Sequence, residues 1–115
     1  MAGGVQDRRH VRRSVRVAVQ VAHAGEPGYG EISLDALDLS QSGAFLQSDL
    51  LLETGDVVTL TFTVPGEIRS ISARARVVWA TRHDVQKGSP GMGVEFVDLS
   101  DADRQIIGAF VRSAR

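Results

Sequence analysis

The sequence contains no cysteine, only six aromatic residues in 115, and no long apolar run. The lack of cysteine excludes disulfides, thiolate metal sites and cysteine nucleophiles. No stretch approaches the roughly 18 consecutive apolar residues of a membrane-spanning helix, and the N-terminal segment has no apolar core of the kind found in signal peptides. We therefore expect a cytoplasmic protein that does not insert into a membrane.

Motifs for catalysis and metal binding are also missing. The chain has no phosphate loop ending in Gly-Lys-Ser/Thr, no nucleophile elbow and no zinc signature. The three histidines, at positions 10, 23 and 83, have no spacing typical of a metal site. We therefore expect neither an enzyme nor a metal-binding protein, and no cofactor.

The composition that remains is that of one globular domain. Hydrophobic residues make up 43% and charged residues 23% of the 115 residues, which is typical of a folded protein. A domain of this length buries roughly two-thirds of the surface of its unfolded chain. The chain can therefore form a hydrophobic core without disulfides or metals.

The charges are balanced overall but unevenly distributed. The formal net charge is −1, from 13 basic and 14 acidic residues, yet five of the basic residues fall within nine positions near the N-terminus. These five are Arg8, Arg9, Arg12, Arg13 and Arg16. An arginine cluster on a nearly neutral chain indicates a local anionic partner rather than an extended polyanion.

Residues 1–13 predict a flexible N-terminal arm, and residues 14–115 predict a single domain. The arm has almost no periodic hydrophobicity and contains Gly3, Gly4 and the arginine run. A segment of this kind can order when it binds a ligand.

Alternating apolar residues predict six β-strands after the arm. A period of two with β-branched residues is typical of half-buried strands. The predicted strands cover residues 14–21, 29–39, 44–47, 58–64, 71–79 and 91–97. In the fifth, Trp79 is expected on the same face as Ile71 and Val77. Short connections between the strands predict a closed or nearly closed antiparallel barrel, because closure removes exposed edges.

A C-terminal helix is expected after the strands, so the predicted fold class is a mainly β barrel with one α-helix. Ser100 with Asp103 resembles an N-terminal capping arrangement, and apolar residues pair at i and i+4 over residues 106–111, which predicts a helix of about 12–14 residues. Helix capping also explains the acidic run at 98–103 better than a carboxylate cluster does.

The first candidate binding segment is the arginine arm. Arg8 with Arg12, or Arg9 with Arg13, can reach one object from a turn of bent chain. Guanidinium groups bind phosphates bidentately, contact O6 and N7 of guanine, and stack on bases. The alternative is a solvated basic tail.

The second candidate segment contains Asp38, Ser40 and Gly43. A carboxylate can accept hydrogen bonds from N1–H and N2–H of guanine, a hydroxyl can add another bond, and glycine lets a ring or phosphate approach the backbone. The alternative is an ordinary turn between strands, with Gly43 needed for its backbone angles.

Together the two segments resemble the PilZ domain family. Arg-x-x-x-Arg is followed, across an alternating strand and a loop, by Asp-x-Ser-x-x-Gly. Further segments agree with the family in order: Gly43-Ala44-Phe45-Leu46, Gly55-Asp56-Val57-Val58, Arg76-Val77-Val78-Trp79 and Gly91-Met92-Gly93-Val94-Glu95-Phe96. The resemblance extends from residue 7 to residue 114. Its strength lies in the order and spacing of motifs that are individually weak.

The resemblance implies a bacterial receptor for the second messenger cyclic di-GMP. By that resemblance the arginines clamp a guanine base and the phosphates, Asp38 and Ser40 meet the other guanine edge, and Gly43 makes room. Trp79 could stack near a guanine, as a tryptophan does there in some relatives, or cap the barrel core.

The register of the arginine pair is open. Counting back from the valine strand favours Arg8 with Arg12, and counting by the double arginine gives Arg9 with Arg13. The resemblance links register to stoichiometry, because relatives with an extra arginine just before the pair tend to bind an intercalated ligand dimer. The preceding residue is Asp7 in the first register and Arg8 in the second.

Ligand binding is expected to fold the arm over the barrel and to create a surface that a downstream protein reads. A monomer and a homodimer are both compatible with the sequence. One alternative is a PilZ-like adaptor that contacts proteins without binding nucleotide. Another is a small nucleic-acid-binding barrel, which the net charge of −1 and the six aromatic residues disfavour.

Overall fold

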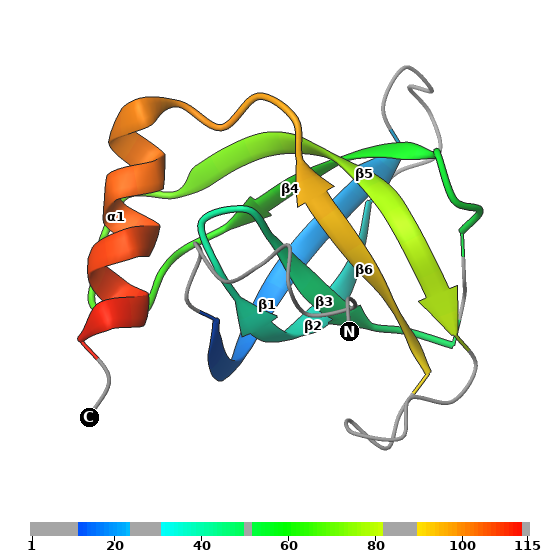
Figure 1. The fold of residues 1–115 in the computed structure, drawn as a ribbon, viewed down its shortest axis with the longest axis horizontal. Helices are drawn as coiled ribbons and strands as arrows, with labels where there is room; N and C mark the ends of the chain where they lie inside the picture. Colours follow the sequence, from blue (N-terminus) through cyan, green and yellow to red (C-terminus); the bar gives the residue numbers. More distant parts are fainter. Residues whose placement is uncertain (1–11, 24–30, 50–51, 82–89, 114–115) are drawn as a thin grey trace, which may run out of the picture.

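The computed structural model describes residues 12–23, 31–49, 52–81 and 90–113. Within these residues, six strands form a closed antiparallel barrel in the order β1-β2-β3-β6-β5-β4, and one helix follows (Figure 1). The elements are β1 (Arg13–His23), β2 (Glu31–Leu39), β3 (Gly43–Gln47), β4 (Val57–Phe62), β5 (Ile71–Thr81), β6 (Gly91–Phe96) and α1 (Asp101–Arg112). The predicted fold class, a mainly β six-stranded barrel with a C-terminal helix, is confirmed.

Some expectations concern residues outside the described ranges. The predicted arm, residues 1–13, is described only from Arg12 onward, so its flexibility and its boundary with the domain stay predictions. Arg8 and Arg9 lie in the segment that is not described. In the described part of the chain, no helix is long and apolar enough to cross a membrane.

The barrel interior is filled by the apolar side of each alternating strand. In β1, Val17, Val19 and Val21 are buried, whereas Ala18 and Gln20 are exposed, as a period of two requires. Two residues of α1 belong to the same buried cluster as the strands, and the helix stands at one end of the barrel (Figure 1). They are Ile107 and Val111.

The helix begins with the predicted cap. The side-chain oxygen of Ser100 accepts a hydrogen bond from the backbone N–H of Asp103 at 3.1 Å. This bond satisfies one of the backbone donors at the start of a helix. The carboxylate of Asp103 also pairs with Arg69, which connects α1 to the segment between β4 and β5.

Three register shifts interrupt the alternation of the strands. They lie between Ser14 and Val17 in β1, between Ala36 and Asp38 in β2, and between Val77 and Trp79 in β5. A β-bulge inserts one extra residue, so side chains beyond it exchange faces. In β2, Leu39 therefore belongs to the core cluster and Asp38 faces outward.

The prediction that Trp79 shares a face with Ile71 and Val77 is wrong. Both aliphatic residues are completely buried, whereas Trp79 is 43% exposed. The bulge in β5 turns the indole to the outer surface of the barrel. A strict period of two cannot reveal this change of face.

Candidate functional site

The outward-facing residues form a row across four neighbouring strands. Asp38 of β2 pairs with Phe45 of β3. Phe45 pairs in turn with Gly93 of β6, which pairs with Trp79 of β5. Neighbouring strands lie about 4.8 Å apart, so this row spans about 14 Å of the outer surface. We call Asp38, Phe45, Gly93 and Trp79 the outer row.

Phe45 and Trp79 stack within the outer row. Their ring centroids are 5.5 Å apart, with 27° between the ring planes. Phe45 is 1% exposed, because the half-exposed indole covers it. A Cβ at Gly93 would lie 2.2 Å from Nε1 of Trp79, and a Cβ at Gly91 would lie 2.3 Å from the ring of Phe45. Glycine at both positions therefore lets the two rings lie directly on the β6 backbone.

At the β2 end of the row, Asp38 forms an ion pair with Arg12. Nη1 of Arg12 donates to Oδ1 of Asp38 at 2.9 Å, and the same oxygen accepts from the backbone N–H of Phe45 at 3.0 Å. The side chain of Asp38 is 10% exposed and that of Arg12 is 40% exposed. A nearly buried carboxylate thus lies beside a guanidinium that is accessible to solvent and ligands.

Ser40 holds the turn between β2 and β3. It is completely buried, and its Oγ accepts from the backbone N–H groups of Ser42 and Gly43 at 3.1 and 3.2 Å. Its own backbone N–H donates to the carbonyl oxygen of Gly43 at 2.9 Å. The hydroxyl therefore shapes the backbone beside Asp38.

Gly43 is required by the neighbouring strand. Among the described glycines, only Gly55 and Gly66 have positive φ. A Cβ at Gly43 would lie 2.0 Å from the carbonyl oxygen of Val94 in β6. The interpretation that Gly43 is needed for its backbone angles is therefore wrong; the close approach of β3 and β6 requires it.

Arg13 contacts α1 and not the outer row. Its Nη1 donates to the carbonyl oxygen of Phe110 at 2.7 Å, and its guanidinium carbon lies 4.2 Å from the centroid of the Phe110 ring. Of the two arginines that complete the alternative registers, Arg12 thus reaches Asp38, and Arg13, the first residue of β1, reaches the helix. Arg8 and Arg9 lie outside the described residues.

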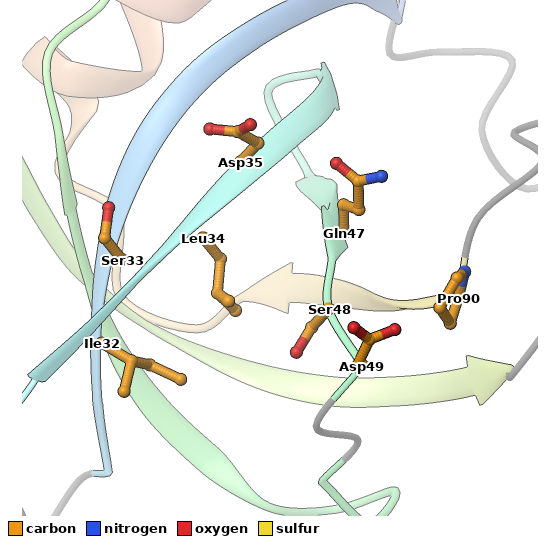
Figure 2. A pocket seen from close by; sticks show the side chains of 8 residues that line it. All are labelled: Ile32, Ser33, Leu34, Asp35, Gln47, Ser48, Asp49 and Pro90. Carbon is orange, nitrogen blue, oxygen red and sulfur yellow. The ribbon is translucent and has the colours of Figure 1, made fainter.

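A shallow groove of about 470 Å³ lies elsewhere, along β2 and β3 (Figure 2). It is lined by Ile32, Ser33, Leu34, Asp35, Gln47, Ser48, Asp49 and Pro90. The ionisable residues of this lining, Asp35 and Asp49, are both acidic, so the lining offers no cation to bind a phosphate. Among the described residues, no three His, Cys, Asp or Glu side chains gather as metal ligands would.

Sequence reasoning missed Phe45, Gly91 and Gly93 as parts of this surface. The available signal was a pair of glycines two residues apart, because residues at that spacing share one face of a strand. It also missed Gln41, whose side chain donates to the carbonyl oxygen of Arg104 at 3.0 Å. No local pattern connects two residues that far apart in the chain.

The sequence matches one family. A family model described as the PilZ domain matches residues 6–113. A search of curated proteins finds no match for the chain.

Several solved structures share the fold. The Inhibitor of motility (MotI/DgrA) of Bacillus subtilis has 22% identity and a TM-score of 0.78; the match covers 92% of this chain and 50% of that one, so this chain spans about half its length. The PilZ domain of CeSA from a cellulose-synthesizing bacterium has 20% identity and a TM-score of 0.59, covering 89% and 95%. The PilZ domain of YcgR from Escherichia coli, solved with c-di-GMP, has 17% identity and a TM-score of 0.67, covering 94% of both chains.

Proposed function

Because this chain belongs to the PilZ family, we propose that it is a bacterial receptor for cyclic di-GMP. The observation that carries the proposal is the ion pair of 2.9 Å between Arg12 and Asp38. It joins one residue of each motif on which the resemblance rests, and it lies at one end of the outer row. The YcgR domain of the same fold was solved with this ligand.

The chemistry of the pair suits a guanine nucleotide. The carboxylate of Asp38 can accept from N1–H and N2–H of a guanine, and the guanidinium of Arg12 can bind a phosphate bidentately. Without ligand the two charges neutralise each other. The ligand supplies both with a new partner, so it can replace the ion pair without leaving a buried charge unpaired.

Trp79 provides a flat apolar surface at the other end of the row. It is 43% exposed, and its ring stacks on the ring of Phe45. Stacking of a base on such a ring is favourable by about 1–3 kcal/mol. We assign Trp79 to base stacking, and Ser40 and Gly43 to the shape of the turn beside the base.

The contacts of Arg12 and Arg13 favour the register of Arg8 with Arg12 for the clamp. Arg12 is next to Asp38, whereas Arg13 is engaged by the carbonyl oxygen and ring of Phe110. In this register the arm folds over the outer row when Arg8 binds the ligand. A downstream protein then reads the new surface, and the role requires no chemical reaction.

Titration calorimetry with cyclic di-GMP tests the proposal, with GTP as the nucleotide control. Arg12→Ala and Asp38→Ala should each weaken binding by one to two decades, on the order of 1–3 kcal/mol for a lost charge-assisted contact. Arg16→Ala is the matched control, because Arg16 lies on β1, close to Arg12 in the sequence, and pairs with Asp35 at 2.6 Å on the exposed surface. It should bind like the parent.

The outcomes separate the parts of the proposal. A parent protein that does not bind cyclic di-GMP contradicts the receptor role and favours an adaptor that contacts only proteins. Parent-like binding by both variants contradicts the site. Weakening by Arg8→Ala but not by Arg9→Ala is expected for the favoured register, and the reverse pattern overturns it.

A further inference from the structure

The turn that carries Ser40 is fastened to α1 by two reciprocal hydrogen bonds. The side-chain amide of Gln41 donates to the carbonyl oxygen of Arg104 at 3.0 Å, and Nη1 of Arg104 donates to the carbonyl oxygen of Gln41 at 3.0 Å. Gln41 follows Ser40 directly in the sequence. A displacement of α1 would therefore pull on the turn beside Asp38.

Gly108 makes this contact possible. It is buried in α1, one helical turn after Arg104, and a Cβ there would lie 2.5 Å from Nε2 of Gln41. Glycine inside a helix costs about 1 kcal/mol relative to alanine. The space at Gly108 thus has a packing role, since it lets the Gln41 side chain lie against the helix backbone.

A second contact links α1 to the segment that carries Arg12. Arg13 donates to the carbonyl oxygen of Phe110 at 2.7 Å and lies over the ring of that residue. Phe110 is in the last turn of α1, where carbonyl groups and the helix dipole favour a cation. The residue before Arg13 is Arg12, so α1 contacts the segments that carry both members of the ion pair.

We propose that α1 is coupled to the ligand site: its contacts with Gln41 and Arg13 hold the site in its binding geometry, and ligand binding in turn stabilises the helix. This proposal rests on the proposed function. Gln41, Arg104 and Gly108 are positioning residues. By thermodynamic linkage, a contact that strengthens ligand binding must be strengthened by the ligand to the same extent.

The test compares two arginines that both fasten α1. Arg104→Ala removes the bond from the guanidinium to the carbonyl oxygen of Gln41 and leaves the bond to the backbone carbonyl of residue 104. Arg69→Ala removes the pair with Asp103, the preceding residue of the same helix. Arg104→Ala should weaken cyclic di-GMP binding at least about fivefold, the lower end of usual coupling. Arg69→Ala should bind like the parent.

Hydrogen exchange supplies a readout that a general loss of stability would not give. Cyclic di-GMP should slow exchange of the α1 amides in the parent and in Arg69→Ala, and this slowing should be smaller in Arg104→Ala. If Arg104→Ala does not fold, Gly108→Ala displaces Gln41 while adding a better helix former, and it should weaken binding similarly.

Three results overturn the coupling. If the parent binds the ligand, and Arg104→Ala and Gly108→Ala bind it as tightly as the parent does, the helix does not position the turn. The receptor role then stands. If Arg69→Ala weakens binding as much as Arg104→Ala, the effect reflects loosening of α1 in general. Absence of binding by the parent overturns both proposals.

Discussion

The outer surface over β2, β3 and β6 is packed, whereas the outer surface over β4 and the start of β5 is open to solvent. On the packed side, Phe45 is 1% exposed although it lies outside the barrel core. On the open side, two exposed hydroxyl pairs meet at 3.3–3.4 Å, one between β4 and β5 and one just beyond their ends. These hydroxyl groups belong to Thr61, Thr63, Ser70 and Ser72, which we call the hydroxyl face.

The difference arises from glycine and bulges, because both faces cover the same apolar interior. Gly43, Gly91 and Gly93 remove side chains on the packed side, so that a neighbouring backbone or a ring can occupy their space. The bulges in β2 and β5 then turn Asp38 and Trp79 onto that side. Such a second layer is unnecessary for closing a barrel.

Gly43→Ala should give the largest loss of stability. The added Cβ would meet the carbonyl oxygen of Val94 at 2.0 Å, and a backbone atom in a ladder cannot move without separating β3 from β6. We expect a loss near the upper end for overpacked sites, about 3 kcal/mol in the free energy of unfolding. Urea unfolding of the variant and the parent measures this difference.

The control for that variant is Gly66→Ala. Gly66 has φ of +93°, with nothing within 4 Å of an added Cβ. Backbone strain alone should cost about 1–2 kcal/mol there. Equal losses for the two variants would mean that the close approach of β3 and β6 is not what Gly43 provides.

Ser40→Ala should have the next largest effect. It removes a buried oxygen that accepts from the backbone N–H groups of Ser42 and Gly43, and unsatisfied buried donors cost about 1–3 kcal/mol. Thr61→Ala removes a hydroxyl from the hydroxyl face and should change the free energy of unfolding by less than about 0.5 kcal/mol. A comparable loss in both variants contradicts the distinction between the faces.

The regular parts of the fold were predictable from the sequence, because alternation alone identifies the six strands and the cap at Ser100 identifies the helix. The residues of the candidate site were proposed from two short motifs, and their role in binding stays a prediction. The face on which Asp38 and Trp79 lie could not be predicted. The bulges before these residues change the face of a side chain without altering the apolar pattern that precedes them. The contact between Gln41 and Arg104 spans 63 positions and follows only from the folded topology.

The smallest expected effect concerns the ion pair between Arg74 and Asp98, beside the hydroxyl face. Hydrogen bonds from the side chain and the backbone N–H of Arg74 lower the pKa of Asp98. Its folded pKa is therefore below the value of about 3.9 in an unfolded chain. The stabilisation is present above that pH and is lost as the pH falls through the folded pKa.

Asp98→Asn should therefore lose slightly less stability than the parent between about pH 5 and pH 2, as measured by urea unfolding at low salt. The effect is small because the side chains of Arg74 and Asp98 are 56% and 42% exposed, and solvent and salt screen such pairs. Identical pH profiles for the two proteins would contradict a role for the pair. A large difference would contradict the contrast between the faces, because an exposed pair would then stabilise the barrel as strongly as the packed surface does.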